Sequence, residues 1–253
     1  LLGKSTDAEQ FRLKRESRKS FLNQKYLDES GKTIKSSLVV AGFGSPPPST
    51  EPQEGKPVDT QASYAVPLHL NAIAEDKKLA VSNHLFAAVE RQNADDSGVI
   101  RPSYSLMTGF IGTASINEAL SEAGRHDLAY RLLQQTSYPS WLYPVINGAT
   151  TIWERLNSYT VDNGFGGNNS MNSFNHYSFG AVGAWMYTHS LGIQRDPKVP
   201  AFKQFILQPT PDPTGQMTFA EGHVETLYGR IESSWRMEAV SYTHLTLPTN
   251  REV

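Results

Sequence analysis

One acidic side chain between an indole and a guanidinium gives residues 148–155 (Gly-Ala-Thr-Thr-Ile-Trp-Glu-Arg) the strongest chemical pattern in the chain. The acid is Glu154, and its neighbours are Trp153 and Arg155. A second stretch, residues 171–180, adds Asn, Ser, His and aromatic side chains. A carboxylate can activate water, an aromatic face can stack on a sugar ring, and Asn and His can hold hydroxyls. The two stretches together are typical of a sugar site.

The composition narrows the classes of function. The 253 residues are 38% hydrophobic, and no apolar run reaches the ~18 to 20 residues of a membrane span. We therefore expect no membrane partner. The formal net charge is −2 and the pI about 6.4, so we expect no nucleic-acid partner either. Cysteine is absent and the seven His show no paired ligand spacing, so no metal and no other cofactor is predicted. The cellular compartment stays open.

Helical periodicity dominates the chain up to Gly192. It predicts amphipathic or apolar helices at about residues 7–27, 61–74, 76–92, 113–123, 127–135 and 172–191. The apolar stripe of the third contains Leu79, Val81, Leu85, Phe86 and Val89. Pro67 should kink or break the second, and Gly124 fits a C-cap. Repeated helix pairs with short connections predict a mainly α chain, built as an α/α toroid or bundle.

Beyond Gly192, prolines separate short apolar runs. Strands joined by turns are predicted at residues 202–207, 217–220 and 229–236. We therefore expect helical barrel over residues 1–196 and the start of a β-rich domain over 197–239, with too few strands to close a sandwich. Residues 240–253 resemble translated sequencing-adapter sequence, so we predict a non-native tail there; one more natural strand is the alternative.

Five motifs occur in one order along the chain. They are residues 60–65 (Thr-Gln-Ala-Ser-Tyr-Ala), 108–113 (Thr-Gly-Phe-Ile-Gly-Thr), 138–143 (Tyr-Pro-Ser-Trp-Leu-Tyr), 148–155, and 172–177 (Asn-Ser-Phe-Asn-His-Tyr). The combination resembles the bacterial α-L-rhamnosidases, a family of glycoside hydrolases, over about residues 1–236. The resemblance implies part of an (α/α)6 barrel, the six-hairpin toroid, followed by a truncated C-terminal β-sandwich domain. It also implies hydrolysis of terminal α-L-rhamnosides with inversion, so the expected partner is a small or oligosaccharide rhamnoside.

Inverting hydrolysis needs a general acid and a general base, with carboxyl groups ~6.5 to 9.5 Å apart. The resemblance implies that Glu154 is the base and that His176 contacts the sugar. Trp141 is the first candidate for an aromatic wall of the pocket, and Asn175 and Trp153 are further candidates for substrate contact.

Each candidate also has a structural interpretation. Glu154 could pair with Arg155 or favour a helix N-terminus, and His176 could be a core histidine. Trp141 fits a buried core residue as well as a sugar platform, and Trp153 fits packing better than contact. Asn175 could bind a hydroxyl or cap the helix predicted to begin there, and capping suits its neighbour Asn172 better.

The family's general acid lies in an upstream segment, roughly Asp-Glu-Arg-Leu-Gly-Trp, which this chain lacks. The chain also begins without Met. We therefore expect an interior fragment of a longer gene, which holds the base half of the site and is inactive alone.

Two other functions stay open. One is a non-catalytic carbohydrate-binding protein, against which the intact motif around Glu154 argues. The other is a different helical-toroid hydrolase or lyase that acts on uronic acids. A uronate site would need several cationic side chains, and only Arg155 is close in sequence.

Overall fold

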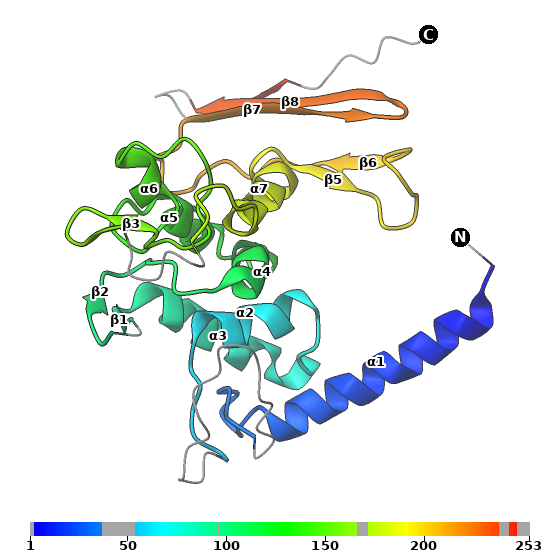
Figure 1. Ribbon diagram of the computed structural model, residues 1–253. Helices are drawn as coiled ribbons and strands as arrows, with labels where there is room; N and C mark the ends of the chain where they lie inside the picture. The colour runs from blue at the N-terminus through cyan, green and yellow to red at the C-terminus, as the bar shows by residue number, and fades with distance from the viewer. Residues whose placement is uncertain (1–2, 37–53, 96, 166–171, 238–242, 247–253) are drawn as a thin grey trace.

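The computed structural model describes residues 3–36, 54–95, 97–165, 172–237 and 243–246. The helices within residues 61–146 form the central body in Figure 1, the helix over residues 5–25 leads away from it, and the hairpin over residues 219–237 lies across the opposite end.

The first helix, α1 (Ser5–Lys25), matches the predicted span and buries none of its residues. It is fastened to the body near its C-terminal end. Asn23 Nδ2 donates to the carbonyl of Ala72 at 2.8 Å, and Asn23 Oδ1 accepts from the backbone N–H of Ala74 at 2.9 Å. One amide side chain therefore links α1 to the segment before α3.

The pair α2 (Gln61–His69) and α4 (Phe110–Glu122) packs at very close range. A Cβ at Gly112 would lie 2.7 Å from that of Ala62, so only glycine permits this approach. The α2 helix ends at His69 rather than near residue 74. The helix continues through Pro67, so the predicted break does not occur at the proline itself. The end coincides with Asn71, whose φ is +49°, and the next N–H, that of Ala72, donates to the carbonyl of Pro67 at 2.8 Å, as in a left-handed helix cap.

The predicted stripe of α3 (Glu75–Glu90) is confirmed for Val81, Leu85 and Val89, which are buried, but is wrong for Leu79, which is 74% exposed. The helices α5 (His126–Gln134) and α6 (Leu142–Ile146) complete the body. Two short hairpins extend from it, β1–β2 (Asn93–Ala94 with Ile100–Arg101) and β3–β4 (Tyr159–Thr160 with Gly164–Phe165). The predicted C-cap is confirmed, because Gly124 follows α4 with φ +80°.

The predicted helix over residues 172–191 is wrong in its first third. Helical structure begins with the 3₁₀ turn η2 (Ser178–Ala181) and continues through α7 (Val182–Trp185) into the π turn η3 (Met186–Ser190). Residues 172–177 instead lie beside residues 151–154. The N–H of Glu154 donates to the carbonyl of Ser173, and that of His176 to the carbonyl of Ile152, both at 2.8 Å. These bonds use backbone groups that a helix would need.

The β-rich part has its own core. The strands β5 (Ile193–Arg195) and β6 (Phe205–Leu207) pair antiparallel, and β7 (Phe219–Thr226), β8 (Gly229–Met237) and β9 (Thr243–Thr246) form a second antiparallel sheet. The buried residues of this core are Leu191, Ile193, Ala220, Ile231 and Trp235. The strands predicted at residues 202–207 and 229–236 correspond to β6 and β8, and the strand predicted at 217–220 begins at Phe219.

Part of the predicted non-native tail is described. Residues Thr243–Thr246 form β9, which pairs with Ser234 to Met237 of β8. A short segment can pair with an open sheet edge whatever its origin. The prediction of an adapter-derived tail therefore stays a prediction.

Buried and partly buried hydrogen bonds join the helical and β-rich parts. Tyr130 on α5 donates its hydroxyl to the carbonyl of Thr210 at 2.6 Å, and Trp235 on β8 donates to the carbonyl of Ser190 at 2.8 Å. Asp212, whose side chain is buried, accepts from Gln134 on α5 at 2.6 Å and from the N–H of Met217 at 2.8 Å. Burial raises the pKa of Asp212, but the hydrogen bonds to its carboxylate outweigh burial and bring the pKa below its usual value.

We predict that Asp212→Asn lowers the free energy of unfolding at pH 7 by about 1.5 to 3 kcal/mol, because charged hydrogen bonds at a buried joint are lost. Since the folded-state pKa is depressed, the carboxylate stabilises the fold above the unfolded value of about 3.9 and loses this contribution as pH falls through the folded pKa. The variant should therefore lose less stability than the parent chain on acidification.

Urea unfolding between pH 7 and pH 3 measures both effects. The matched control is Asp196→Asn, since Asp196 is only half-buried and accepts from the N–H of Lys198 in an exposed hydrogen bond. Equal stability of the Asp212 variant and the parent at pH 7 would contradict the prediction.

Candidate active site

A cavity of about 450 Å³ lies between α4, the loop before it and the segment that carries Glu154. Residues 95, 106–110, 138–139, 154–157 and 179 line it. The loop over residues 105–107 is fixed by Gln61, which is buried on α2. Its Nε2 donates to the carbonyl of Ser105 at 2.9 Å, and its Oε1 accepts from the N–H of Met107 at 2.9 Å. The floor of the cavity therefore depends on one buried amide.

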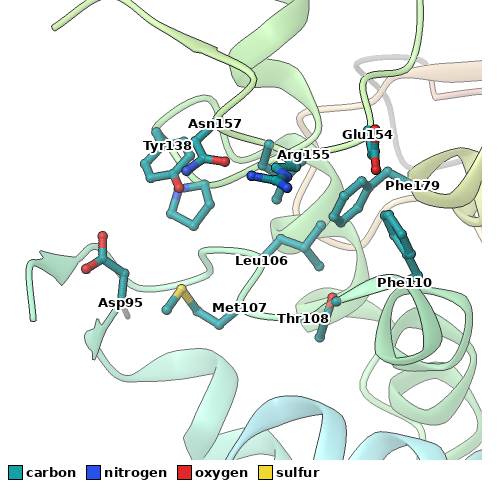
Figure 2. Close-up of a pocket in the computed structure, with 13 residues that line it drawn as sticks. Asp95, Leu106, Met107, Thr108, Phe110, Tyr138, Glu154, Arg155, Asn157 and Phe179 are labelled. Atoms are coloured by element: carbon teal, nitrogen blue, oxygen red, sulfur yellow. The ribbon is translucent and has the colours of Figure 1, made fainter. Parts of the chain in front are cut away.

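Glu154 lies at one end of this cavity with Phe110 and Phe179 (Figure 2). The side chain is half-buried, and its Oε2 accepts from the N–H of Ser173 at 2.7 Å. Two structural interpretations of this carboxylate do not hold. Glu154 lies outside any helix, and within the described part of the chain no ion pair joins it to Arg155.

Arg155 brings the positive charge of the motif to the same cavity. Its backbone forms a tight turn with Ser158, whose Oγ accepts from the N–H of Arg155 at 3.2 Å and whose N–H donates to the carbonyl of Arg155 at 3.0 Å. The turn directs Glu154, Arg155 and Asn157 to one cavity, as Figure 2 shows.

His176 is held between two aromatic rings. The ring of Phe110 is stacked on it with centroids 4.8 Å apart, and that of Tyr177 with centroids 5.3 Å apart. Its Nδ1 accepts from the N–H of Ser178 at 3.3 Å, so the neutral imidazole carries its proton on Nε2. His176 is therefore half-buried and lies beside the cavity rather than in the core. It does not line the cavity itself, but its stacking partner Phe110 does.

The tryptophans of the two motifs lie in packing positions. Trp141 is 8% exposed, and its indole donates to the carbonyl of Phe179 at 2.8 Å, so it supports the cavity from behind. Trp153 is equally buried, with its ring edge-to-face against Phe174 at 5.3 Å. Neither ring lines the described cavity, so the structure supports the packing interpretation of both.

The two asparagines have different surroundings. Asn175 is exposed, and its backbone N–H donates to the hydroxyl of Ser173 at 3.1 Å. The predicted helix-capping role of Asn172 is wrong, because helical structure begins only at Ser178 and the Asn172 amide donates instead to the carbonyl of Ser158 at 3.3 Å.

Asp95 is the other carboxylate that lines the cavity. Arg101 donates to it at 2.6 Å, and the N–H groups of Ser97 and Val99 donate at 2.9 and 3.0 Å. The hydrogen bond from Arg101 is the largest of the effects that hold the pKa of Asp95 below its usual range. This carboxylate is thus ionised at neutral pH and is poorly suited to donate a proton.

Two sets of cavity residues were missed as site candidates. Thr108 and Phe110 belong to the motif at residues 108–113, and Tyr138 to the motif at 138–143. Membership of these two motifs is the sequence signal that could have identified these residues as part of the site. Asp95 and Asn157 carried none, because a polar residue in a turn has an ordinary structural explanation.

Among the described residues, no group of three or more His, Asp or Glu side chains is arranged to hold a metal ion. The same part of the chain contains no helix with the length and apolar character required to cross a bilayer.

Comparison with models of known protein families identifies the family of this chain. The model of the bacterial α-L-rhamnosidase 6 hairpin glycosidase domain matches residues 1–190, and that of the bacterial α-L-rhamnosidase C-terminal domain matches residues 192–253. The chain belongs to the bacterial α-L-rhamnosidase family. The mainly α fold with a small β-rich domain is thereby confirmed, and the two models meet at the start of the second core.

Individual relatives show the same family. An α-L-rhamnosidase of Alteromonas sp. (strain LOR) is 34% identical over 250 residues, which cover 98% of this chain and 23% of the relative. An α-L-rhamnosidase of Streptomyces avermitilis is 36% identical over 181 residues, which cover 72% of this chain and 16% of the relative. The chain thus spans less than a quarter of the length of these relatives.

Solved structures give the same result. The crystal structure of Streptomyces avermitilis α-L-rhamnosidase complexed with L-rhamnose matches with a TM-score of 0.68 and 32% identity, over 87% of this chain and 18% of that one. The crystal structure of the Aspergillus terreus enzyme matches with a TM-score of 0.73 and 25% identity, over 93% of this chain and 23% of that one.

We predict that Trp141→Phe lowers the free energy of unfolding by about 1 to 3 kcal/mol, because the buried carbonyl of Phe179 loses its donor. Chemical denaturation measures this loss, and unchanged stability would contradict the packing interpretation of Trp141.

Proposed function

We propose that this chain carries the general-base side of an α-L-rhamnoside hydrolase site, and that Glu154 activates the water that attacks the anomeric carbon with inversion. The proposal rests chiefly on one observation, the carboxylate of Glu154 at the edge of a cavity of about 450 Å³ in a chain of this family. The cavity volume falls within the range of about 300 to 1,000 Å³ typical of small-molecule sites.

The hydrogen bond from Ser173 assigns different tasks to the two carboxylate oxygens. Oε2 is occupied by the N–H of Ser173. Oε1 is then the atom that takes the proton of the attacking water. The N–H of Ser173 holds the carboxylate, and the N–H of Glu154 holds the backbone of Glu154 to the carbonyl of Ser173, so the orientation of the side chain is set before a substrate arrives.

The remaining groups fit a sugar. The rings of Phe110 and Phe179 supply an apolar wall beside Glu154, and His176 stacks behind Phe110 with a proton on Nε2 available for a hydroxyl. Phe110 is therefore the best aromatic candidate for substrate contact, and His176, which does not itself line the cavity, is a candidate through its stack on Phe110. Asn175 remains a candidate because its side chain is exposed next to His176.

An inverting site needs one carboxyl group as general acid and a second as general base. Of the described residues that line the cavity, only Asp95 and Glu154 are acidic, and Arg101 holds Asp95 in its ionised form. We predict that the purified chain binds L-rhamnose but does not hydrolyse aryl α-L-rhamnosides. A colorimetric assay of the released phenol measures this, and turnover that is lost in Glu154→Gln would contradict it.

The base role can be tested in a complete site. In a chimera, this chain replaces the matching 250-residue segment of the Alteromonas sp. relative. We predict that the chimera hydrolyses aryl α-L-rhamnosides with inversion, which NMR of the first-formed anomer reports. Glu154→Gln should lower kcat by about 10² to 10⁴, the usual contribution of general acid–base catalysis.

Glu221→Gln is the control, since Glu221 is exposed on β7. An active chimera in which Glu154→Gln has no effect would refute the base role. A folded chimera that binds L-rhamnose and never turns over would favour the carbohydrate-binding alternative.

A further inference from the structure

Four aromatic rings form a cluster beside the segments that carry Glu154 and Ser173. The rings are those of Trp153, Tyr159, Phe165 and Phe174, and each is edge-to-face with two of the others. This is a geometry that aromatic pairs favour. Trp153 is buried, yet it belongs to neither of the two hydrophobic cores among the described residues. The cluster is therefore a separate, local unit of packing.

Two of the rings flank the hydrogen bond that orients the carboxylate. Trp153 directly precedes Glu154, and Phe174 directly follows Ser173, whose N–H donates to Glu154 Oε2 at 2.7 Å. The rings of Trp153 and Phe174 have centroids 5.3 Å apart. Trp153 is buried whereas Glu154 lines the cavity, so these neighbouring side chains point in different directions. The rings thus hold the two segments together away from the cavity that the carboxylate faces.

The other two rings come from the β3–β4 hairpin. Tyr159 and Phe165 are cross-strand partners, and their ring centroids are 5.2 Å apart. The ring of Phe165 contacts that of Phe174 at 5.7 Å, and the ring of Tyr159 contacts that of Trp153 at 6.5 Å. The hairpin therefore touches both of the segments that meet at Glu154 and Ser173.

The hairpin is itself held at two places. The N–H of Val161 donates to the hydroxyl of Tyr143 on α6 at 3.0 Å. The buried Ser158 precedes β3, and its carbonyl accepts from the amide of Asn172 at 3.3 Å. A group that supports a reactive side chain can do so only if its own position is fixed, and these bonds supply that condition.

The ring of Phe165 can be removed without opening a core. Phe165 is 67% exposed. An aliphatic side chain in its place loses two ring contacts but leaves no buried void, and substitutions at such exposed positions usually change global stability little. The contribution of this ring to the site can therefore be measured apart from its contribution to the fold.

We infer that Phe165 is a positioning residue for Glu154, which acts through the ring of Phe174 to keep the N–H of Ser173 on the carboxylate. The inference rests on the proposed function, because it takes Glu154 as the base. Phe165 is not among the described residues that line the cavity, so it acts only through other side chains. Its effect should therefore appear in the rate of the chemical step rather than in substrate affinity.

Amide hydrogen exchange, measured by NMR on the isotope-labelled 253-residue chain, reports how firmly the two segments are held together. The amides to follow are those of Glu154, Ser173 and His176, which donate the hydrogen bonds between the segments. We expect Phe165→Leu to speed their exchange by about tenfold, because two aromatic contacts are lost. Exchange in β8 should stay unchanged, since that strand belongs to the second core.

Three further variants complete this experiment. Phe165→Tyr keeps the ring and should restore the parent exchange rates. Phe11→Leu is the matched control, since Phe11 is 70% exposed on α1 and should have no effect on these amides. Tyr143→Phe removes the hydroxyl that holds Val161, so it should speed exchange less than Phe165→Leu does. If Phe165→Leu also speeds exchange in β8, Tyr143→Phe decides, and parent rates in that variant overturn the inference.

The chimera with the Alteromonas sp. relative tests the consequence for catalysis. Phe165→Leu should lower kcat about five- to tenfold and leave KM unchanged, whereas Phe165→Tyr should restore kcat. In the Glu154→Gln background, Phe165→Leu should cause no further loss, because the ring acts through that carboxylate. A purely structural role for Phe165 would lower the rate equally in both backgrounds.

The outcomes separate this inference from the proposed function. Parent exchange rates in Phe165→Leu overturn the inference, as does a higher KM with unchanged kcat, and the proposed function stands in either case if Glu154→Gln is impaired. Faster exchange together with a fully active Glu154→Gln chimera overturns the base role and, with it, the positioning of a base. Faster exchange together with a loss of kcat that depends on Glu154 supports both.

Discussion

The backbone pairing of residues 151–154 with residues 173–176 is the constraint on which the candidate site depends. Glu154 and Ser173 exchange hydrogen bonds in both directions, one of them to the carboxylate itself. The same pairing brings His176 to Phe110, where the two rings stack. Two segments with little regular structure are thereby hydrogen-bonded to each other, and the carboxylate of Glu154 is held in one orientation.

Buried polar side chains extend this order outward. Gln61 fixes the loop before α4, Trp141 donates to the carbonyl of Phe179, and Asp212 joins α5 to the β-rich part. An unpaired polar group in such places would cost about 1 to 3 kcal/mol, so each of these groups specifies one arrangement of the loops around it. The cavity owes its shape to these few bonds as much as to the apolar core beneath it.

Environment separates the two carboxylates of the cavity into different roles. The ionised carboxylate of Asp95 is paired with Arg101 and accepts hydrogen bonds within its own turn. Glu154, in contrast, accepts one backbone N–H and faces the cavity. The same side-chain chemistry thus serves structure in one place and is available for reaction in the other.

Local pattern determined the helices α1, α3, α4 and α5, because apolar spacing and caps are properties of neighbouring residues. The order of the motifs determined the family, and with it Glu154 as the candidate base. Tertiary structure decided what residues 172–177 do and where Trp141 and Trp153 point. A backbone that finds partners some twenty residues away abandons the helix its own sequence favours. Burial of an indole depends on what packs over it, which no window of sequence contains.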